Sequence, residues 1–186
     1  DQEKATGKMA DFNSPVPVVK LAELADHADV IVECAPSAVF DEVAEAAIEK
    51  GRIFIPLSCA ALLTRWHLVE RAEETGARII VPTGALVGFD AVRAAAEGGI
   101  HSVRMKTVKP PKSVAKAPYV IENQLNVMNL TEPLKIFEGT AREAAVHFPA
   151  NVNVAAALSM AGIGADETMV ELWADPAQER NTHRIY

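Results

Sequence analysis

The chain has 186 residues, of which 49% are hydrophobic, and its formal net charge is −7. Its 25 acidic residues outnumber the 18 basic ones and are spread along the chain, which argues against nucleic acid as a partner because that binding relies on clustered Lys and Arg. No apolar run approaches the ~20 residues that span a bilayer, and the charged segment Asp1–Lys4 does not resemble a signal peptide, so we expect a cytoplasmic protein with no membrane partner.

The two cysteines, Cys34 and Cys59, are too few for a disulfide framework or a metal site. Both lie in or just after apolar, strand-like runs. We therefore expect buried, inert thiols and no bound metal.

The first half of the chain alternates between short apolar runs and helical patterns. The apolar runs are typical of strands buried on both faces, and they cover 30–35, 53–57 and 78–82. The helical patterns between them, ended by Gly51 and Gly76, place these residues inward: Val39, Val43, Ala46 and Ala47, then Leu62, Trp66 and Val69. This order predicts a doubly wound α/β fold with a parallel sheet in residues 28–82.

In such sheets, ligands bind in the loops beyond the carboxyl ends of the strands. Those loops are 35–37, 58–60 and 83–88, and all three consist mainly of small residues. Small side chains let the backbone approach a flat cofactor closely.

After Gly88 the pattern changes to that of an α+β sheet domain. We expect helices at 89–97, 141–148 and 151–161, strands at 103–108, 134–139 and 168–174, and a loop at 109–118. Thr140 and Glu143 form a capping box that should begin the second of these helices. The predicted domains are thus 1–86, a partial Rossmann-like dinucleotide-binding domain, and 87–186, an α+β catalytic and dimerisation domain.

The Gly-x-Gly-x-x-Gly turn that holds a pyrophosphate in dinucleotide folds is not found in this sequence. Gly162-Ile163-Gly164 follows a helical pattern and lacks the third glycine, so it predicts a helix-ending turn. The sequence begins where the second strand of such a fold would end. We therefore expect an N-terminal truncation, and weaker NAD(H) binding by these residues alone than by a complete enzyme.

Four segments together resemble the L-aspartate dehydrogenases. They are 82–90, 109–113, 137–145 with 148–155, and 174–176 with 181–183. Their order and spacing match the family along nearly the whole chain, although family members also carry a Gly-rich strand–helix before residue 1 and further elements after Tyr186.

The resemblance implies NAD(P)-dependent interconversion of L-aspartate with oxaloacetate and ammonia, through iminoaspartate, by a homo-oligomer that contributes to NAD biosynthesis. The family's active-site histidine falls on His183. Its nicotinamide-side contacts fall on Ala85 and Asn153.

These residue types suit the chemistry. Histidine has an unperturbed pKa near ~6.5, so His183 can give or take a proton near neutral pH while a hydride moves to the cofactor. Without the resemblance, His183 would more simply be a surface loop residue. Asn153 could contact the cofactor through its amide, or equally cap a helix.

Lys109 and Lys112 bracket two prolines that stiffen their loop. Aspartate brings two carboxylates that cationic side chains must meet, so both lysines are candidates for substrate binding, with two exposed loop lysines as the alternative. Asp1 is a candidate for the ribose hydroxyls.

Two other functions stay open at this point. One is a related amino-acid or imine dehydrogenase with another substrate, and the other is a cofactor-free fragment that uses its sheet to dimerise. The choice between NAD and NADP is also open, because the residues that face the ribose 2′ position lie at or before Asp1.

Overall fold

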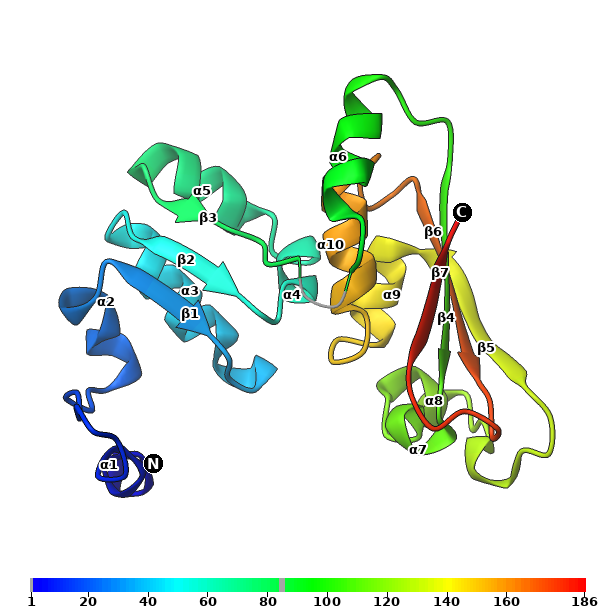
Figure 1. Ribbon diagram of the computed structural model, residues 1–186, viewed down its shortest axis with the longest axis horizontal. Coiled ribbons are helices and arrows are strands. Elements are labelled where there is room, and N and C mark those ends of the chain that lie inside the picture. The colour runs from blue at the N-terminus through cyan, green and yellow to red at the C-terminus, as the bar shows by residue number, and fades with distance from the viewer. Residues whose placement is uncertain (1, 84–85) are drawn as a thin grey trace. The chain divides into compact units, whose positions relative to one another are not determined.

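The computed structural model describes residues 2–83 and 86–186, and the chain forms two compact units (Figure 1). The first unit comprises the chain up to Pro56 together with His67–Ile80, and the second comprises Leu57–Trp66 with Val81–Tyr186. None of the helices in the described ranges is long and apolar enough to cross a membrane.

The first unit is built on a parallel sheet with the strand order β1-β2-β3. Its strands are β1 (Val30–Glu33), β2 (Ile53–Pro56) and β3 (Arg78–Ile79). Its helices are α1 (Gln2–Met9), η1 (Leu21–Glu23), α2 (Leu24–His27), η2 (Ser37–Val39), α3 (Phe40–Glu49) and α5 (His67–Thr75). The predicted parallel sheet is confirmed, and each of its strands is shorter than the apolar run that predicted it.

Helix α3 supplies most of the helical side of this unit's core. Val43 and Ala47 of the predicted stripe are buried, and Phe40 is buried with its ring against that of Phe54 on β2, with 5.8 Å between the ring centroids. The apolar spacing along α3 is that of a helix with one face on the sheet, and α5 packs against the same helix.

The prediction of a single helix between β2 and β3 is wrong. The structure has α4 (Ala60–Leu63) and α5, separated by a turn in which Trp66 is 44% exposed rather than buried. The break arises because Leu63 packs in the core of the second unit, whereas Leu68 on α5 is buried in the first.

The two cysteines differ. Cys59 is buried as predicted, but Cys34 is exposed, so the prediction for Cys34 is wrong. Glu33 of β1 is buried, and the alternation of a strand turns the next side chain outward.

The second unit is built on a mixed sheet with the strand order β5-β6-β4-β7. Its strands are β4 (Val103–Lys109), β5 (Leu134–Thr140), β6 (Thr168–Ala174) and β7 (Thr182–Ile185). β4 pairs parallel to β6, while β5 and β7 run antiparallel to their neighbours. Three of these strands are predicted from the sequence, whereas β7, which carries His183, is not.

Helices cover one face of this sheet (Figure 1). The helices of this unit are α4, α6 (Phe89–Glu97), α7 (Pro111–Val114), α8 (Pro118–Glu122), η3 (Val127–Asn129), α9 (Ala141–His147) and α10 (Asn153–Ala161). α9 contacts β5 and β6, and α10 contacts α9, α6 and α4. The capping box of Thr140 and Glu143 at the start of α9 is confirmed.

The prediction that 109–118 is a loop is wrong, because α7 forms within it. Pro111 lies in the first turn of α7, where the missing N–H of proline costs nothing, and Val114 is buried in the core.

The two faces of the second sheet differ in character. On β4, the alternate residues that face the helices are buried: Val103, Met105, Thr107 and Lys109. On the opposite face, Arg104 pairs with Glu138 and Glu171. The helix-covered face is therefore apolar at the start of β4 and polar at its end.

Candidate functional site

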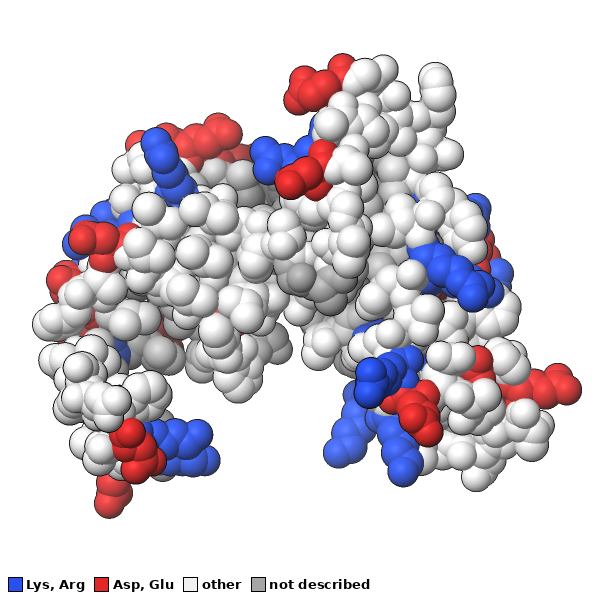
Figure 2. All heavy atoms as spheres, viewed as in Figure 1, with Lys and Arg blue, Asp and Glu red and all other residues white. Residues whose placement is uncertain are grey.

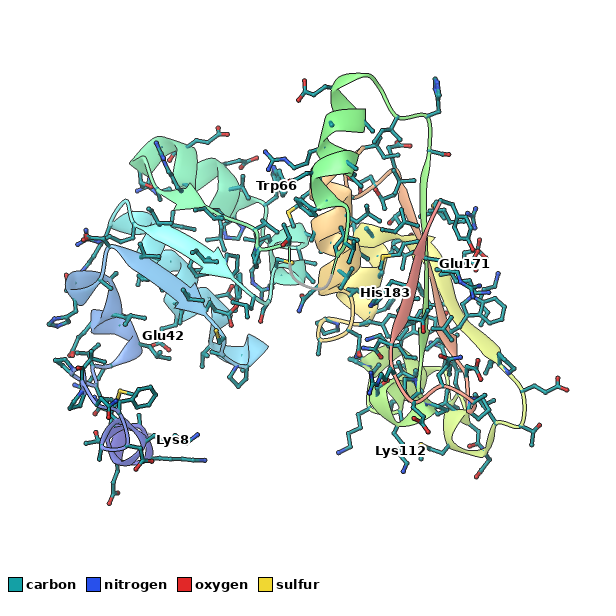
Figure 3. The ribbon with its side chains drawn as sticks, in the orientation of Figure 1. Lys8, Glu42, Trp66, Lys112, Glu171 and His183 are labelled. Atoms are coloured by element: carbon teal, nitrogen blue, oxygen red, sulfur yellow. The ribbon has the colours of Figure 1, made fainter. Side chains whose placement is uncertain are left out.

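Three polar side chains share the helix-covered face of the second sheet near the end of β4: Thr107, Lys109 and His183. Thr107 lies directly opposite His183 in the antiparallel pairing of β4 with β7, and 3.0 Å separates Thr107 Oγ1 from His183 Nδ1. Lys109 follows two residues later on β4, so strand alternation places it on the same face. Figure 3 shows His183 on β7 in the second unit.

The surroundings of His183 keep its ring neutral. The side chain is half-buried, and burial lowers its pKa below the usual 6.5. The positive charge of Lys109 lowers this pKa further. At pH 7 His183 is therefore an uncharged imidazole, the form that can accept a proton.

Lys109 is a buried cation, 5% exposed, whose Nζ donates a hydrogen bond to Asn151 Oδ1 at 3.2 Å. Burial lowers its pKa from the usual 10.5. Among the described residues no carboxylate lies within ion-pair distance of Lys109. A buried ammonium without a counter-ion is costly, and an arriving carboxylate would reduce that cost.

His183 lines a cavity of about 350 Å³. The cavity is also lined by Leu86, Val87, Asn181, Thr182 and Ile185. Leu86 and Val87 directly follow Ala85, the predicted cofactor contact. Ala85 itself lies outside the described residues, as does Asp1.

Asn153 lines a second cavity, of about 190 Å³. Its other lining residues are Leu57, Cys59, Pro82, Thr83, Val154 and Ala157. Asn153 is the first residue of α10, but its side chain does not cap that helix. Instead, Asn153 Oδ1 accepts a hydrogen bond from the Ala60 N–H, at 3.1 Å, at the start of α4. Within the described ranges, no acceptor is paired with Asn153 Nδ2.

Described residues that follow β3 in the sequence line both cavities. Pro82 and Thr83 line the cavity of Asn153, and Leu86 and Val87 line that of His183. Thr83, Leu86 and Val87, which belong to the small-residue ligand loop predicted at 83–88, thus each line a cavity.

The structure separates the two candidate lysines. Lys112 is exposed on α7, where it projects from the ribbon in Figure 3. Figure 2 shows a group of basic side chains over the α7–α8 segment, in which Lys112 and Lys116 are exposed. Only Lys109 is placed on the face that carries His183.

Thr107 is the site residue that the sequence interpretation missed. A signal was present for Thr107, since the alternation along 103–109 puts Thr107 and Lys109 on the face that Val103 and Met105 bury. Polar residues on a buried strand face call for a specific partner.

Comparison with known proteins assigns one family model to each half of the chain. Residues 90–186 match the family model described as "Aspartate dehydrogenase, C-terminal", and residues 1–82 match "Homoserine dehydrogenase, NAD binding domain". The predicted fold class, a Rossmann-like unit followed by an α+β unit, is therefore confirmed.

Individual relatives point the same way. L-aspartate dehydrogenase of Bradyrhizobium diazoefficiens is 48% identical over 185 residues, covering 100% of this chain and 66% of the relative. L-aspartate dehydrogenase 3 of Bordetella bronchiseptica is 52% identical over 183 residues, covering 96% of this chain and 67% of the relative. The chain thus spans about two thirds of the length of these curated relatives.

A crystal structure of aspartate dehydrogenase from Thermotoga maritima is also similar, with a TM-score of 0.67 and 28% sequence identity. The match covers 84% of this chain and 62% of that one. The family model that matches more than half of the chain and the identity to these relatives lead to one conclusion: the chain belongs to the L-aspartate dehydrogenase family.

Proposed function

We propose that the protein is an NAD(P)-dependent L-aspartate dehydrogenase that interconverts L-aspartate with oxaloacetate and ammonia. The observation that carries this proposal is that a half-buried His183, whose pKa is lowered, shares one face of the sheet with the buried cation Lys109, which has no carboxylate partner among the described residues. One group can move a proton, and the other can hold a carboxylate.

In the direction of oxidation, a bound nicotinamide would supply the acceptor for the hydride that leaves Cα of aspartate. His183 takes the proton from the substrate nitrogen, and iminoaspartate forms. Water then hydrolyses the imine to oxaloacetate and ammonia. Lys109 donates to one carboxylate of the substrate and holds the amine at the imidazole.

The cofactor supplies the hydride acceptor, and the cavity of Asn153 suits one end of it. Its walls include Leu57, Pro82 and Val154, which are apolar, and the amide nitrogen of Asn153 is available as a donor. A flat ring that carries a carboxamide fits such lining. Ala85, three residues after Pro82 in the sequence, is the second proposed contact, and Lys112 is a further candidate for substrate binding.

The proposal also covers the location, the assembly and the metabolic role of the enzyme. We place it in the cytoplasm as a homo-oligomer, where the iminoaspartate that it forms can serve NAD biosynthesis. Family membership and the absence of membrane-like segments from the sequence support this assignment.

A substrate comparison tests the proposal. With purified full-length protein, we expect reduction of NAD or NADP with L-aspartate and less than about a hundredth of that kcat/KM with L-malate or L-glutamate. Malate lacks the amine that gives its proton to His183, and glutamate displaces the second carboxylate by one methylene. A clear preference for glutamate or another amine would instead identify a related amino-acid dehydrogenase, and no reduction with any of them would reject the function.

A further inference from the structure

The partner of His183 Nδ1 is a hydroxyl, whereas the partner of a catalytic histidine is often a carboxylate. Thr107 Oγ1 lies 3.0 Å from this nitrogen, in the facing position of the neighbouring strand. Thr107 is 4% exposed, and its Oγ1 has no other hydrogen-bond partner among the described residues. The second ring nitrogen, Nε2, has none either.

We propose that Thr107 is the positioning residue of His183, holding Nδ1 so that Nε2 is the nitrogen that exchanges protons with the substrate. This inference rests on the proposed function, because it takes His183 as the acid and base of the reaction. It adds the residue that sets the orientation of the ring.

A hydroxyl suits this task because its oxygen can accept a hydrogen bond from Nδ1–H and carries no charge. Because Nε2 must be free of hydrogen to accept a proton, Nδ1 keeps its hydrogen in the neutral ring, and Nδ1–H donates to the Thr107 hydroxyl both before and after Nε2 is protonated. One hydrogen bond therefore persists through the whole proton cycle, and the ring need not turn between steps.

The hydroxyl also leaves the ring free of a fixed counter-charge. Lys109 on β4 is the charged side chain that acts on His183, while Leu86 and Val87 bring apolar surface to the same cavity. Arg184 on β7 faces the other side of the sheet with Lys106. Thr107 thus orients the imidazole without adding an ion pair that would hold it protonated.

Two substitutions separate positioning from packing. Thr107→Val keeps the volume and removes the hydroxyl, whereas Thr107→Ser keeps the hydroxyl and removes a methyl group. We expect Thr107→Val to lower kcat for aspartate roughly 10- to 100-fold, with KM changed less than about twofold, and Thr107→Ser to stay within about threefold of the unmodified kcat. If Thr107 only packed, Thr107→Val would keep its kcat and Thr107→Ser would have the lower kcat.

NMR titration of the His183 ring supplies a readout that does not depend on activity, with His183→Gln used to assign its signal. The hydrogen bond to the charged ring is the stronger one, so the pKa of His183 should fall in Thr107→Val and stay unchanged in Thr107→Ser. If Thr107→Val does not fold, Thr107→Ala against Thr107→Ser gives the same comparison.

The inference is overturned if the valine variant keeps its kcat, if serine is no better than valine, or if the pKa of His183 does not fall when the hydroxyl is lost. Failure of the unmodified protein to oxidise aspartate would reject the proposed function instead. The titration would still decide whether Thr107 holds the ring.

Discussion

Replacement of His183 by alanine is expected to lower kcat for aspartate oxidation by roughly 10²–10⁴-fold, the usual contribution of a general acid or base. The affinity for NADH, measured by fluorescence titration, should change little, because His183 lines the cavity beside Leu86 and Val87 and not that of Asn153. His67→Ala, at an exposed position on α5, is the matched control and should keep full turnover. Intact turnover in His183→Ala would make His183 a structural residue.

The pH dependence of kcat/KM should also report the role of His183 as the base. The base must be neutral to accept a proton, and both burial and Lys109 disfavour the charged ring of His183. The rate of aspartate oxidation should therefore fall only as pH drops through a pKa below 6.5. This acid limb should vanish in His183→Ala, and a limb above 6.5 in the unmodified protein would contradict the environment described for His183.

Lys109→Met is expected to raise the KM for aspartate and oxaloacetate by roughly 10- to 100-fold, because a hydrogen bond to a charged group contributes about 1.5–3 kcal/mol. The KM for the nicotinamide cofactor should change far less. Methionine keeps the length and the apolar stem of the side chain, so packing against the sheet is largely retained.

The Lys109→Met substitution should also stabilise the unliganded protein. Lys109 is buried, and its lowered pKa means that the fold disfavours its charged form. Stability should accordingly rise with pH as it increases from the folded pKa to the unfolded value of 10.5. Lys109→Met removes the charge at every pH, so its thermal midpoint at pH 7 should lie above that of the unmodified protein.

Lys112→Met is the comparison variant, because Lys112 is exposed on the neighbouring helix α7. We expect its KM values and its thermal midpoint to stay close to those of the unmodified protein. Equal effects of the two substitutions on the KM for substrate and for cofactor would point to folding of the 109–118 segment instead of a carboxylate contact.

Much of the fold could be predicted because the relevant signals are local. The apolar runs at β1 and β2, the stripe of Val43 and Ala47, and the capping box of Thr140 each depend on residues close together in sequence. Such patterns determine elements whichever way those elements later pack.

The features that were missed depend on distant partners. β7 has only four residues, of which His183 alone is not exposed, and it forms a strand because β4 lies beside it. Leu57–Trp66 follows a strand of the first unit but packs in the second, which breaks the expected helix at Trp66. Neither the strand β7 nor the break at Trp66 is indicated by a pattern among neighbouring residues in the sequence.

For the site, resemblance to the family indicated His183 and Asn153, and the structure adds what surrounds them. The pairing of β4 with β7 brings the hydroxyl of Thr107 to His183, and the folded chain also buries Lys109 beside the amide of Asn151. The alternation of β4 could have suggested Thr107, but not its partner.

The most direct measurement is oxidation of NADH or NADPH by the full-length protein with oxaloacetate, in the presence and absence of ammonium, with the product identified by NMR. We expect one L-aspartate formed for each nicotinamide oxidised, and no oxidation without ammonium. Oxidation that proceeds equally without ammonium and yields malate would show that the protein reduces the ketone without taking up ammonia, and would contradict the role given to His183 and Lys109.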